Sequence, residues 1–558
     1  MTGEALLSIR DLAVEYRTTG GPVTAVNGVS FDVEAGKVTA LVGESGSGKS
    51  TVAQSAIGLL ASNGRIAGGS IRLNERTEGL TELVGLTERR WRNLRGRCIG
   101  LIPQDPGNSM NPVATIGASV GEALRIHGWR DGAKIRSRVI DLLDRVGIDD
   151  PETRARQYPH ELSGGMRQRV LIAAAIALEP ELIIADEPTS ALDVTVQRTV
   201  LDLLDRLREE SGTGVLFITH DLAVAADRSD AIVVMRGGEV QEAGPSSEVL
   251  TAPAAEYTRT LLADAPSLAQ VVERTPPLVV PGERPLVEVS GLRQEFGRGA
   301  GRTPLVAVDD VSFSVPRGTT HALVGESGSG KTTTGRSIAG FNRPTAGTIR
   351  VGDTDVTALR SARDFRRTTQ LVYQNPYGSL DPRQTIAGIL AEPLANFRIG
   401  DRAERADRVA HHLELVSLAP EIGARRPREL SGGQRQRVAI ARALILEPEL
   451  VVLDEAVSAL DVTVQAQILR LLARLQGELG LTYVFISHDL AVVRQIADTV
   501  SVLQRGQQVE LGTAAQVFDD PQHAYTRQLL AAIPGTVFRG AEESGRDGAG
   551  TGSEGRGR

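Results

Sequence analysis

The sequence has little cysteine, no long apolar run and no excess of positive charge. Cys98 is the only cysteine among 558 residues, which excludes an internal disulfide and a cysteine-held zinc or iron–sulfur site. The longest apolar stretches are interrupted by Glu179, Glu181 and Asp186, so none reaches the roughly 18 residues that cross a bilayer. The net charge of −7 argues against general attraction to nucleic acid. We therefore expect a chain that neither crosses a membrane itself nor binds nucleic acid.

The composition predicts a folded chain of several domains. Hydrophobic residues make up 41% and charged residues 23%, as in average soluble proteins, and 558 residues exceed one ordinary core. Residues 1–17 lack the basic, apolar and small-residue regions of an export signal, so we expect a cytoplasmic chain. Residues 539–558 are rich in Gly, Ser, Glu and Arg, which predicts a disordered tail.

The chain contains an internal duplication. The heptapeptide GESGSGK begins at Gly43 and again at Gly325, and SGG triplets begin at Ser163 and Ser431. The first pair is 282 positions apart and the second 268, so the first copy carries extra residues between the two motifs. Five prolines between residues 266 and 285 indicate an extended linker. We predict a first domain over 1–265, a linker over 266–285 and a second domain over 286–538.

Each copy shows the pattern of an α/β fold. Buried-strand patterns at Val38–Val42 and Thr320–Val324 run directly into the glycine loops. Later apolar runs at Leu182–Ala185 and Val215–Ile218 alternate with helical stretches such as Val194–Arg208. Such alternation predicts two tandem α/β domains, each with a mainly parallel sheet at its core.

The glycine loops have the composition of phosphate-binding loops. Glycines let the backbone curl so that successive amides point at phosphate oxygens, and the helix that follows adds positive potential. Lys49 and Lys331 would neutralise the β- and γ-phosphates, and the hydroxyls of Ser50 and Thr332 would bind Mg²⁺. The candidate nucleotide-binding residues are Gly43, Ser45, Gly46, Gly48, Lys49, Ser50 and Thr51, with Gly325, Ser327, Gly328, Gly330, Lys331, Thr332 and Thr333 in the second copy.

Paired carboxylates end an apolar run in each copy, at Asp186-Glu187 and Asp454-Glu455. The carboxyl end of a central parallel strand is where such a pair is expected. The aspartates would hold Mg²⁺, and the glutamates would polarise the water that attacks the γ-phosphate. Together with the glycine loops, these pairs predict P-loop nucleotide hydrolases that use ATP and Mg²⁺.

The SGG motifs narrow the class. Leu162-Ser163-Gly164-Gly165-Met166 and Leu430-Ser431-Gly432-Gly433-Gln434 resemble the signature of ABC ATPases. That resemblance implies an antiparallel β part and a helical signature subdomain in each domain. It also implies an intramolecular head-to-tail dimer, because each signature, Ser163–Gly165 or Ser431–Gly433, would face the nucleotide held by the other copy.

The same resemblance implies further site residues. Gln104 and Gln374 are similar to the Q-loop glutamine, which contacts Mg²⁺, and His220 and His488 are similar to the H-loop histidine. The implied catalytic set is Glu187, Glu455, His220, His488, Gln104 and Gln374, and the implied metal set is Ser50, Gln104, Asp186, Thr332, Gln374 and Asp454. Tyr16 and Phe296 lie where the family stacks an aromatic ring on adenine, although core packing would also explain them.

Two departures from the family pattern are present. Met166 replaces the usual glutamine of the first signature, and Ala456-Val457 replaces the Pro-Thr found at residues 188–189. Neither removes a phosphate, metal or water ligand, so we predict that both sites hydrolyse ATP, with room for unequal rates.

Other segments resemble the oligopeptide, dipeptide and nickel importer family. These are Pro103–Pro106, Gln374–Pro376, and the segments Glu256-Tyr257-Thr258-Arg259 and Ala524-Tyr525-Thr526-Arg527 near the domain ends. Amphipathic helix packing alone would also account for the Tyr-Thr-Arg segments. The resemblance implies two permease subunits contacted through their coupling helices, an extracytoplasmic solute-binding protein, and a position on the cytoplasmic face of the membrane. Without the family's cysteine cluster, no iron–sulfur cluster is expected.

Peptides are the predicted solute, with nickel and glutathione as alternatives. Translation-associated ABC proteins also join two ATPase domains, but their linker is long, charged and helical, whereas residues 266–285 are short and proline-rich. DNA-repair ABC ATPases carry cysteine zinc modules that one cysteine cannot build.

Overall fold

The structure, a computed structural model, describes residues 5–190, 192–268, 282–297, 304–374, 376–458 and 460–535. The predicted tail 539–558 and most of the predicted linker 266–285 lie outside these residues. The chain divides into unit 1, residues Met1–Ala269 with Pro534–Arg558, and unit 2, residues Gln270–Ile533.

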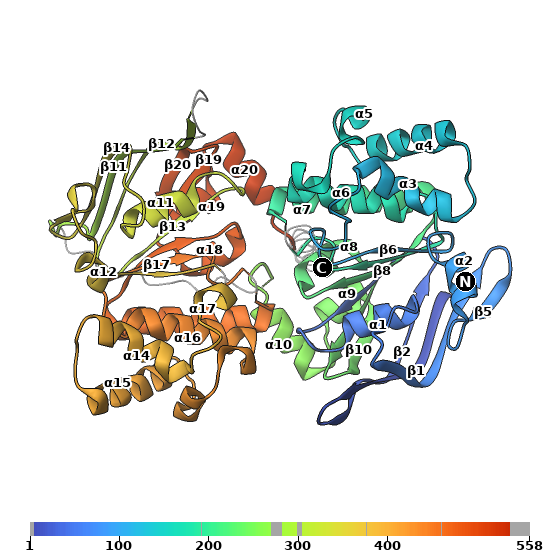
Figure 1. The fold of residues 1–558 in the computed structure, drawn as a ribbon, viewed down its shortest axis with the longest axis horizontal. Coiled ribbons are helices and arrows are strands. Elements are labelled where there is room, and N and C mark those ends of the chain that lie inside the picture. The colour runs from blue at the N-terminus through green and yellow to red at the C-terminus, as the bar shows by residue number, and fades with distance from the viewer. Residues whose placement is uncertain are drawn as a thin grey trace, which may run out of the picture. The chain divides into compact units, whose positions relative to one another are not determined.

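Unit 1 contains two sheets (Figure 1, blue to green). The six-stranded sheet has the order β10-β9-β3-β8-β7-β6, in which every neighbouring pair is parallel except β9 and β10. Its strands are β3 (Val38–Val42), β6 (Ile99–Ile102), β7 (Leu182–Asp186), β8 (Gly214–Thr219), β9 (Ala231–Arg236) and β10 (Glu239–Pro245). The antiparallel sheet has the order β2-β1-β4-β5, from β1 (Ala5–Thr18), β2 (Gly21–Glu34), β4 (Gly64–Glu75) and β5 (Gly79–Glu82).

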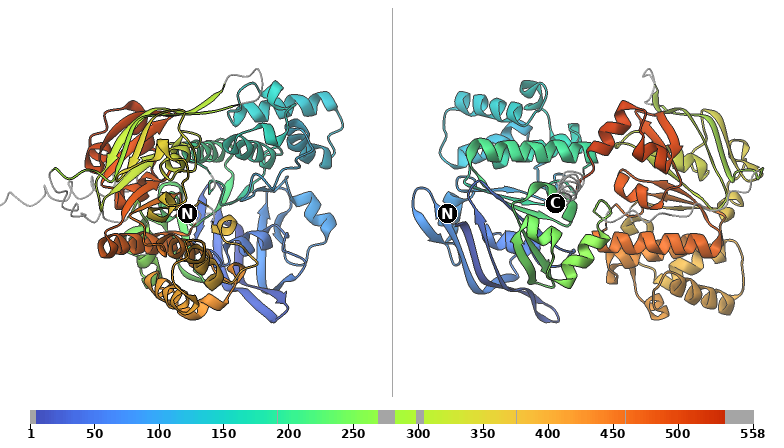
Figure 2. Two further views of the ribbon diagram at one scale, coloured as in Figure 1. Left: turned by 60° about the vertical axis from the view of Figure 1, so that its left-hand side comes forward. Right: turned by 180° about the vertical axis from the view of Figure 1, so that it is seen from behind.

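Strands β3, β7 and β8 are buried along their whole length, as expected for parallel strands covered on both faces. One face packs against the antiparallel sheet through residues such as Leu41, Ile184 and Leu216. The other face packs against helices through Ala40, Phe217 and their neighbours. Figures 1 and 2 show helices α3, α4 and α5 gathered beside α6 on this second side.

The helices of unit 1 connect these strands. They are α1 (Lys49–Ala56), α2 (Glu88–Leu94), α3 (Ile116–Ile126), α4 (Gly132–Arg145), α5 (Pro151–Arg154), α6 (Gly164–Ala175), α7 (Val194–Ser211), α8 (Leu222–Arg228), α9 (Ser246–Thr251) and α10 (Glu256–Asp264), with a 3-10 turn η1 (Pro159–Glu161).

Unit 2 repeats this plan (Figure 1, yellow-green to red). The six-stranded sheet has the order β16-β17-β18-β13-β19-β20 and the antiparallel sheet β12-β11-β14-β15. The strands are β11 (Val287–Phe296), β12 (Leu305–Val315), β13 (Thr320–Val324), β14 (Ala346–Val351), β15 (Thr354–Asp355), β16 (Thr369–Val372), β17 (Leu450–Asp454), β18 (Thr482–Ile486), β19 (Thr499–Gln504) and β20 (Gln507–Thr513).

The helices of unit 2 follow the same order. They are α11 (Lys331–Ile338), η2 (Val356–Ala358), α12 (Phe365–Thr368), α13 (Pro376–Ser379), α14 (Ile386–Asn396), α15 (Arg402–Leu415), η3 (Pro420–Ala424), η4 (Pro427–Glu429), α16 (Gly432–Leu444), α17 (Val462–Leu479), α18 (Leu490–Ile496), α19 (Ala514–Asp519) and α20 (Ala524–Ala531).

The predicted parallel sheet, antiparallel part and helical region are therefore present in each unit. Some of the extra residues of the first copy lengthen its antiparallel sheet, because β4 has 12 residues where β14 has 6, and β5 has 4 where β15 has 2. Across the residues that the structure describes, every helix is too short or too polar to cross a membrane.

Candidate nucleotide-binding sites

The glycine loop of unit 1 joins β3 to α1 in a conformation that side chains disfavour. Gly43, Gly46 and Gly48 have φ values of 150°, 80° and 100°. A Cβ atom at Gly43 would lie 2.2 Å from the carbonyl oxygen of Met235. In unit 2 the corresponding Gly325 has a φ of 143°, and its Cβ would lie 2.1 Å from the carbonyl oxygen of Leu503. In both loops a neighbouring backbone carbonyl lies so close that only glycine, which has no Cβ, fits at the first position.

The lysine that follows each loop donates hydrogen bonds back to the first two residues of that loop. Lys49 is 5% exposed, and its Nζ donates to the carbonyl oxygens of Gly43 at 2.6 Å and Glu44 at 2.8 Å. Lys331 is 4% exposed and donates to Gly325 at 2.7 Å and Glu326 at 2.8 Å. A buried ammonium group needs hydrogen-bond acceptors to offset its lost hydration, and these carbonyl oxygens provide them. They hold the ammonium group at the place where phosphate oxygens are expected.

A hydroxyl and a carboxylate meet at the start of the first helix. Ser50 Oγ donates to Asp186 Oδ1 at 3.1 Å, and Thr332 Oγ1 donates to Asp454 Oδ1 at 2.8 Å. Burial raises the pKa of both aspartates above the ordinary value, and the hydroxyl bonds oppose that rise. Oxygen donors from two elements at this distance are the ligand type that Mg²⁺ prefers, so these residues fit the predicted metal.

A glutamine, a glutamate and a histidine converge in each unit. In unit 1, Gln104 Nε2 donates to Glu187 Oε2 at 2.9 Å, and His220 Nδ1 lies 3.3 Å from the same oxygen. In unit 2 the Gln374–Glu455 bond is 2.6 Å and the His488–Glu455 distance is 3.4 Å. The three residues follow β6, β7 and β8, or β16, β17 and β18, which are adjacent parallel strands whose carboxyl ends share one edge.

The two glutamates have an unusual backbone and a lowered pKa. Glu187 and Glu455 have φ values of 46° and 48°, and their amides donate to the carbonyl oxygens of Ile218 at 2.9 Å and Ile486 at 3.0 Å. Burial alone would raise the pKa of each carboxyl, but the bond and charge of the adjacent histidine hold it below its ordinary value. A carboxylate that stays ionised is the form that can accept a proton from water.

The signature serines begin helices. Ser163 Oγ accepts from the amide of Met166, and Ser431 Oγ accepts from the amide of Gln434, both at 3.3 Å. A Cβ on Gly165 or Gly433 would lie 2.4 Å from a methyl group of Val196 or Val464. The helix start and its amides therefore lie close against the next helix, α7 or α17. Among the described residues, no hydrogen bond joins either serine to the glycine loop of its own unit.

The two predicted adenine-stacking aromatics differ in placement. Tyr16 is partly buried in β1, and its hydroxyl lies 3.4 Å from Thr51 Oγ1 at the start of α1. Phe296 ends β11 with 40% of its surface exposed. To stack on either ring, the adenine of a nucleotide bound at the glycine loop would have to extend toward the antiparallel sheet. The stacking role of both residues stays a prediction.

Sequence reasoning missed one contact to each glycine loop. The hydroxyl of Tyr257 in α10 accepts from the amide of Glu44 at 3.4 Å, and that of Tyr525 in α20 accepts from the amide of Glu326 at 3.1 Å. The signal was present in the repeated Tyr-Thr-Arg segments, which sequence alone also explains by helix packing.

Comparison with known proteins defines the class. The ABC transporter family model matches residues 26–190 and 308–458, and the model of the oligopeptide/dipeptide transporter C-terminal region matches residues 509–548. This chain belongs to the ABC transporter family. The family resemblance, the fold class and the ATPase activity expected from the sequence are therefore confirmed.

Within the family, the chain is an ATP-binding subunit of the importer type. It is 42% identical over 608 residues to the oligopeptide transport ATP-binding protein OppD of Mycobacterium tuberculosis, a match that covers 95% of this chain and 98% of that protein. It is also 42% identical over 558 residues to the glutathione import ATP-binding protein GsiA of Salmonella typhimurium, covering 95% and 89%. The solved structure of cbiO1 from Clostridium perfringens is 26% identical, with a TM-score of 0.39, and covers 43% of this chain and 92% of that one.

Proposed function

We propose that the chain binds MgATP at two sites and hydrolyses it to power peptide import. The cluster of glutamine, glutamate and histidine, found once in each unit, is the observation that supports this most directly. Lys49 and Lys331 bind the phosphates, and Glu187 and Glu455 orient and deprotonate the attacking water. Ser50 and Asp186, or Thr332 and Asp454, would hold Mg²⁺, which would supply positive charge to the phosphate oxygens.

Each site is completed by the signature of the other unit, so that Ser431 faces the nucleotide on Lys49 and Ser163 faces the one on Lys331. Each signature serine begins an α-helix whose first amides form an anion-binding end. The family resemblance supports the pairing, as does the lack of any hydrogen bond, among the described residues, from either serine to its own glycine loop.

This pairing is tested by leaving one site intact. In a Lys331→Ala background only the Gly43 loop binds ATP, and Ser431→Arg should then weaken ATP binding at least tenfold while Ser163→Arg leaves it within twofold. The reverse pattern, in which Ser163→Arg weakens binding, would mean that each unit builds its site alone. The domains in this proposal are residues 1–265 and 286–538, joined by residues 266–285.

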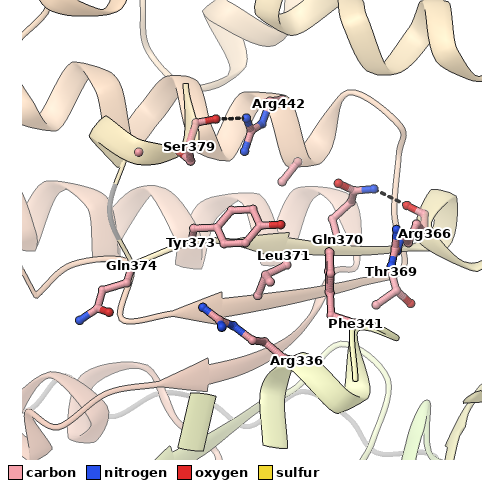
Figure 3. Close-up of a pocket in the computed structure, with 12 residues that line it drawn as sticks. Arg336, Phe341, Arg366, Thr369, Gln370, Leu371, Tyr373, Gln374, Ser379 and Arg442 are labelled. Atoms are coloured by element: carbon pink, nitrogen blue, oxygen red, sulfur yellow. Dashed lines mark hydrogen bonds between the residues drawn. The ribbon is translucent and has the colours of Figure 1, made fainter. Parts of the chain in front are cut away.

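Permease subunits contact the protein beside the Q-loop. In unit 2 a cavity of about 640 Å³ lies between β16, the end of α11 and α16. Figure 3 shows the Tyr373 ring pointing into it, with Gln374 at one end and Arg336 below. Arg366 stacks on Phe341 at 4.4 Å, and Arg442 donates to the carbonyl of Ser379. Guanidinium groups around aromatic rings suit a helix end that carries acidic and apolar side chains.

Cysteine cross-linking tests this contact, because the one native cysteine is buried. Phe341→Cys places a thiol at the rim of the cavity, where the phenylalanine is 42% exposed. With a cysteine in the coupling helix of the permease, it should form a disulfide-linked product. Leu479→Cys, on a residue 48% exposed at the end of α17, should form none. Equal cross-linking from both positions would refute the assignment.

The transported solute is a peptide, and the protein acts on the cytoplasmic face of the membrane. The names of the relatives, one for oligopeptides and one for glutathione, support a peptide-like solute. The test uses vesicles that contain the chain together with its permease subunits and solute-binding protein. ATP should drive uptake of a labelled tripeptide, and the Lys49→Ala, Lys331→Ala double variant should not. Uptake of glutathione but not of the tripeptide would assign the second relative's solute instead.

A further inference from the structure

The C-terminal helix of each unit reaches the glycine loop through one tyrosine. Tyr257 and Tyr525 are 8% and 5% exposed, and each accepts the amide hydrogen of the loop's second residue, Glu44 at 3.4 Å or Glu326 at 3.1 Å. The same contact between segments 213 and 199 residues apart occurs in both units. A contact kept in both copies of a duplication indicates a defined arrangement of the helix on the loop.

The peptide group that meets Tyr257 also meets the lysine. The carbonyl oxygen of Gly43 and the amide of Glu44 belong to one planar peptide unit. Its oxygen accepts from Lys49 Nζ at 2.6 Å, and its N–H donates to the tyrosine hydroxyl. The plane is therefore fixed from both sides, and rotation of the plane would move the acceptor on which the lysine rests.

The loop needs such a fixed point because its glycines permit many conformations. Three of the six residues between β3 and α1, namely Gly43, Gly46 and Gly48, have φ values of 80° or more. Glycine loses more conformational entropy than any other residue when it is ordered. If the loop is not already held in place, ATP binding must order it, and the entropy lost lowers the affinity for ATP.

The tyrosine is in turn held by the neighbouring strands. The Arg236 guanidinium lies 4.8 Å from the centre of the Tyr257 ring, at the end of β9. The amides of Ala254 and Ala255, which precede α10, donate to Glu242 of β10 at 2.7 and 3.1 Å. The same arrangement anchors α20, where Gln522 and His523 donate to Glu510 at 2.7 and 3.1 Å. The hydroxyl is thus presented by a helix whose start is fixed to the sheet.

We propose that Tyr257 and Tyr525 are positioning residues that hold each glycine loop in its ATP-binding conformation, so that the C-terminal helix of a unit sets the ATP affinity of that unit. This inference rests on the proposed role of the glycine loops. Neither tyrosine touches the reacting atoms, so ATP affinity should change while the hydrolysis step stays nearly the same.

Tyrosine to phenylalanine variants of the full chain test the proposal. Tyr257→Phe keeps the ring and its arginine contact but removes the hydroxyl. In a Lys331→Ala background, where the Gly43 loop alone binds ATP, it should weaken ATP binding about threefold to tenfold, the effect of one hydrogen bond. In a Lys49→Ala background it should have no effect on the remaining site, whereas Tyr525→Phe should. In the otherwise unchanged chain, the double variant should raise KM for ATP and change kcat less than twofold.

Tyr483→Phe is the matched control. Its hydroxyl is buried and donates to the carbonyl of Leu472 at 3.1 Å, near the amino end of β18 and away from the loop. It should lower thermal stability without changing ATP affinity. If Tyr257→Phe and Tyr525→Phe behave like Tyr483→Phe, the positioning role is wrong. If Lys49→Ala and Lys331→Ala together leave ATP binding intact, the glycine loops are not the sites and the proposed function fails instead.

Discussion

Gln374 Nε2 donates to Glu455 Oε2 at 2.6 Å, which joins the cavity beside β16 directly to the carboxylate that we propose as the catalytic base. Gln374 lines that cavity, while Glu455 follows β17 and also lies 3.4 Å from His488. A permease helix that moved Gln374 would change the hydrogen bonds of Glu455. The bond thus offers a physical route by which the transport step and hydrolysis could depend on each other.

Glutamine in place of each glutamate tests whether both sites hydrolyse ATP. An amide cannot take up the proton of the attacking water, so Glu187→Gln and Glu455→Gln should each slow their own site by about a hundredfold or more. Each single variant should lower the steady-state rate of phosphate release, and the double variant should lower it by about a hundredfold or more. ATP binding, measured by calorimetry, should persist in all three. An unchanged rate in one single variant would show that the two sites do not participate equally.

The first signature lacks half of the capping arrangement found in the second. In α16 the amide of Ser431 donates to Gln434 Oε1 at 3.0 Å, in addition to the bond that Ser431 Oγ accepts. In α6 only the bond to Ser163 Oγ is present, because the Met166 side chain has no oxygen that could accept a hydrogen bond from the amide of Ser163. Met166→Gln should complete the capping box and raise the free energy of unfolding of unit 1 by about 0.5 to 1 kcal/mol.

Denaturation in urea measures this change, and Gln434→Met in unit 2 is the reverse experiment. The reverse is the cleaner of the two, since Met166 also packs partly against the core and its replacement loses some of that contact. We expect Gln434→Met to destabilise unit 2 by a similar amount. If neither variant shifts the midpoint, the second bond of the capping box contributes nothing to stability.

The sequence predicts Glu187 from its carboxylate pair, and the family resemblance implies Gln104 and His220. Sheet order explains why the three side chains converge. Each residue comes after a short apolar run, and parallel strands bring their carboxyl ends to one edge. The capping difference could also be read from sequence, as Ser-x-x-Gln against Ser-x-x-Met. Both rest on local pattern combined with one general rule of topology.

The tyrosine contacts could not be predicted in this way. Tyr257 meets Glu44 only because α10 returns across the sheet, and the distance between them in sequence is 213 residues. No periodicity in the helix distinguishes a hydroxyl aimed at a loop from one aimed at solvent. The positive φ of Glu187 is equally hidden, since its sequence context of an apolar strand and a Pro-Thr pair fits several turns.

His321 should make unit 2 sensitive to acid. Its ring is fully buried in β13, stacks on Phe313 at 4.2 Å and bonds to the hydroxyls of Thr499 and Ser501 at 2.7 and 2.9 Å. Burial lowers its pKa from 6.5 to about 3. The unfolded chain binds a proton below about pH 6.5 that the folded chain does not, so stability falls between about pH 6.5 and 3, by up to about 1.4 kcal/mol per pH unit.

The first copy supplies the control, because Thr39 occupies the position that corresponds to His321. His321→Thr removes the titrating ring and should flatten the pH dependence of the unfolding free energy of unit 2 between pH 6 and 4. Thr39→Ser should leave the pH dependence of unit 1 as it is. A slope for the His321→Thr variant equal to that of the parent chain would assign the acid sensitivity to other groups.

Cys98 should report the unfolding of unit 1 by its reactivity. It is 4% exposed, and its Sγ lies 3.7 Å from Glu75 Oε2. Burial raises the pKa of this thiol to about 11, and the charges of Glu75 and Glu181 add to the rise. At pH 8 only about a thousandth of the folded protein carries the reactive thiolate, against roughly a quarter of the unfolded chain. Because it is the only cysteine, mass spectrometry after iodoacetamide treatment should show one adduct in urea and almost none in native buffer. A native labelling rate within tenfold of the rate in urea would contradict the burial and the raised pKa together.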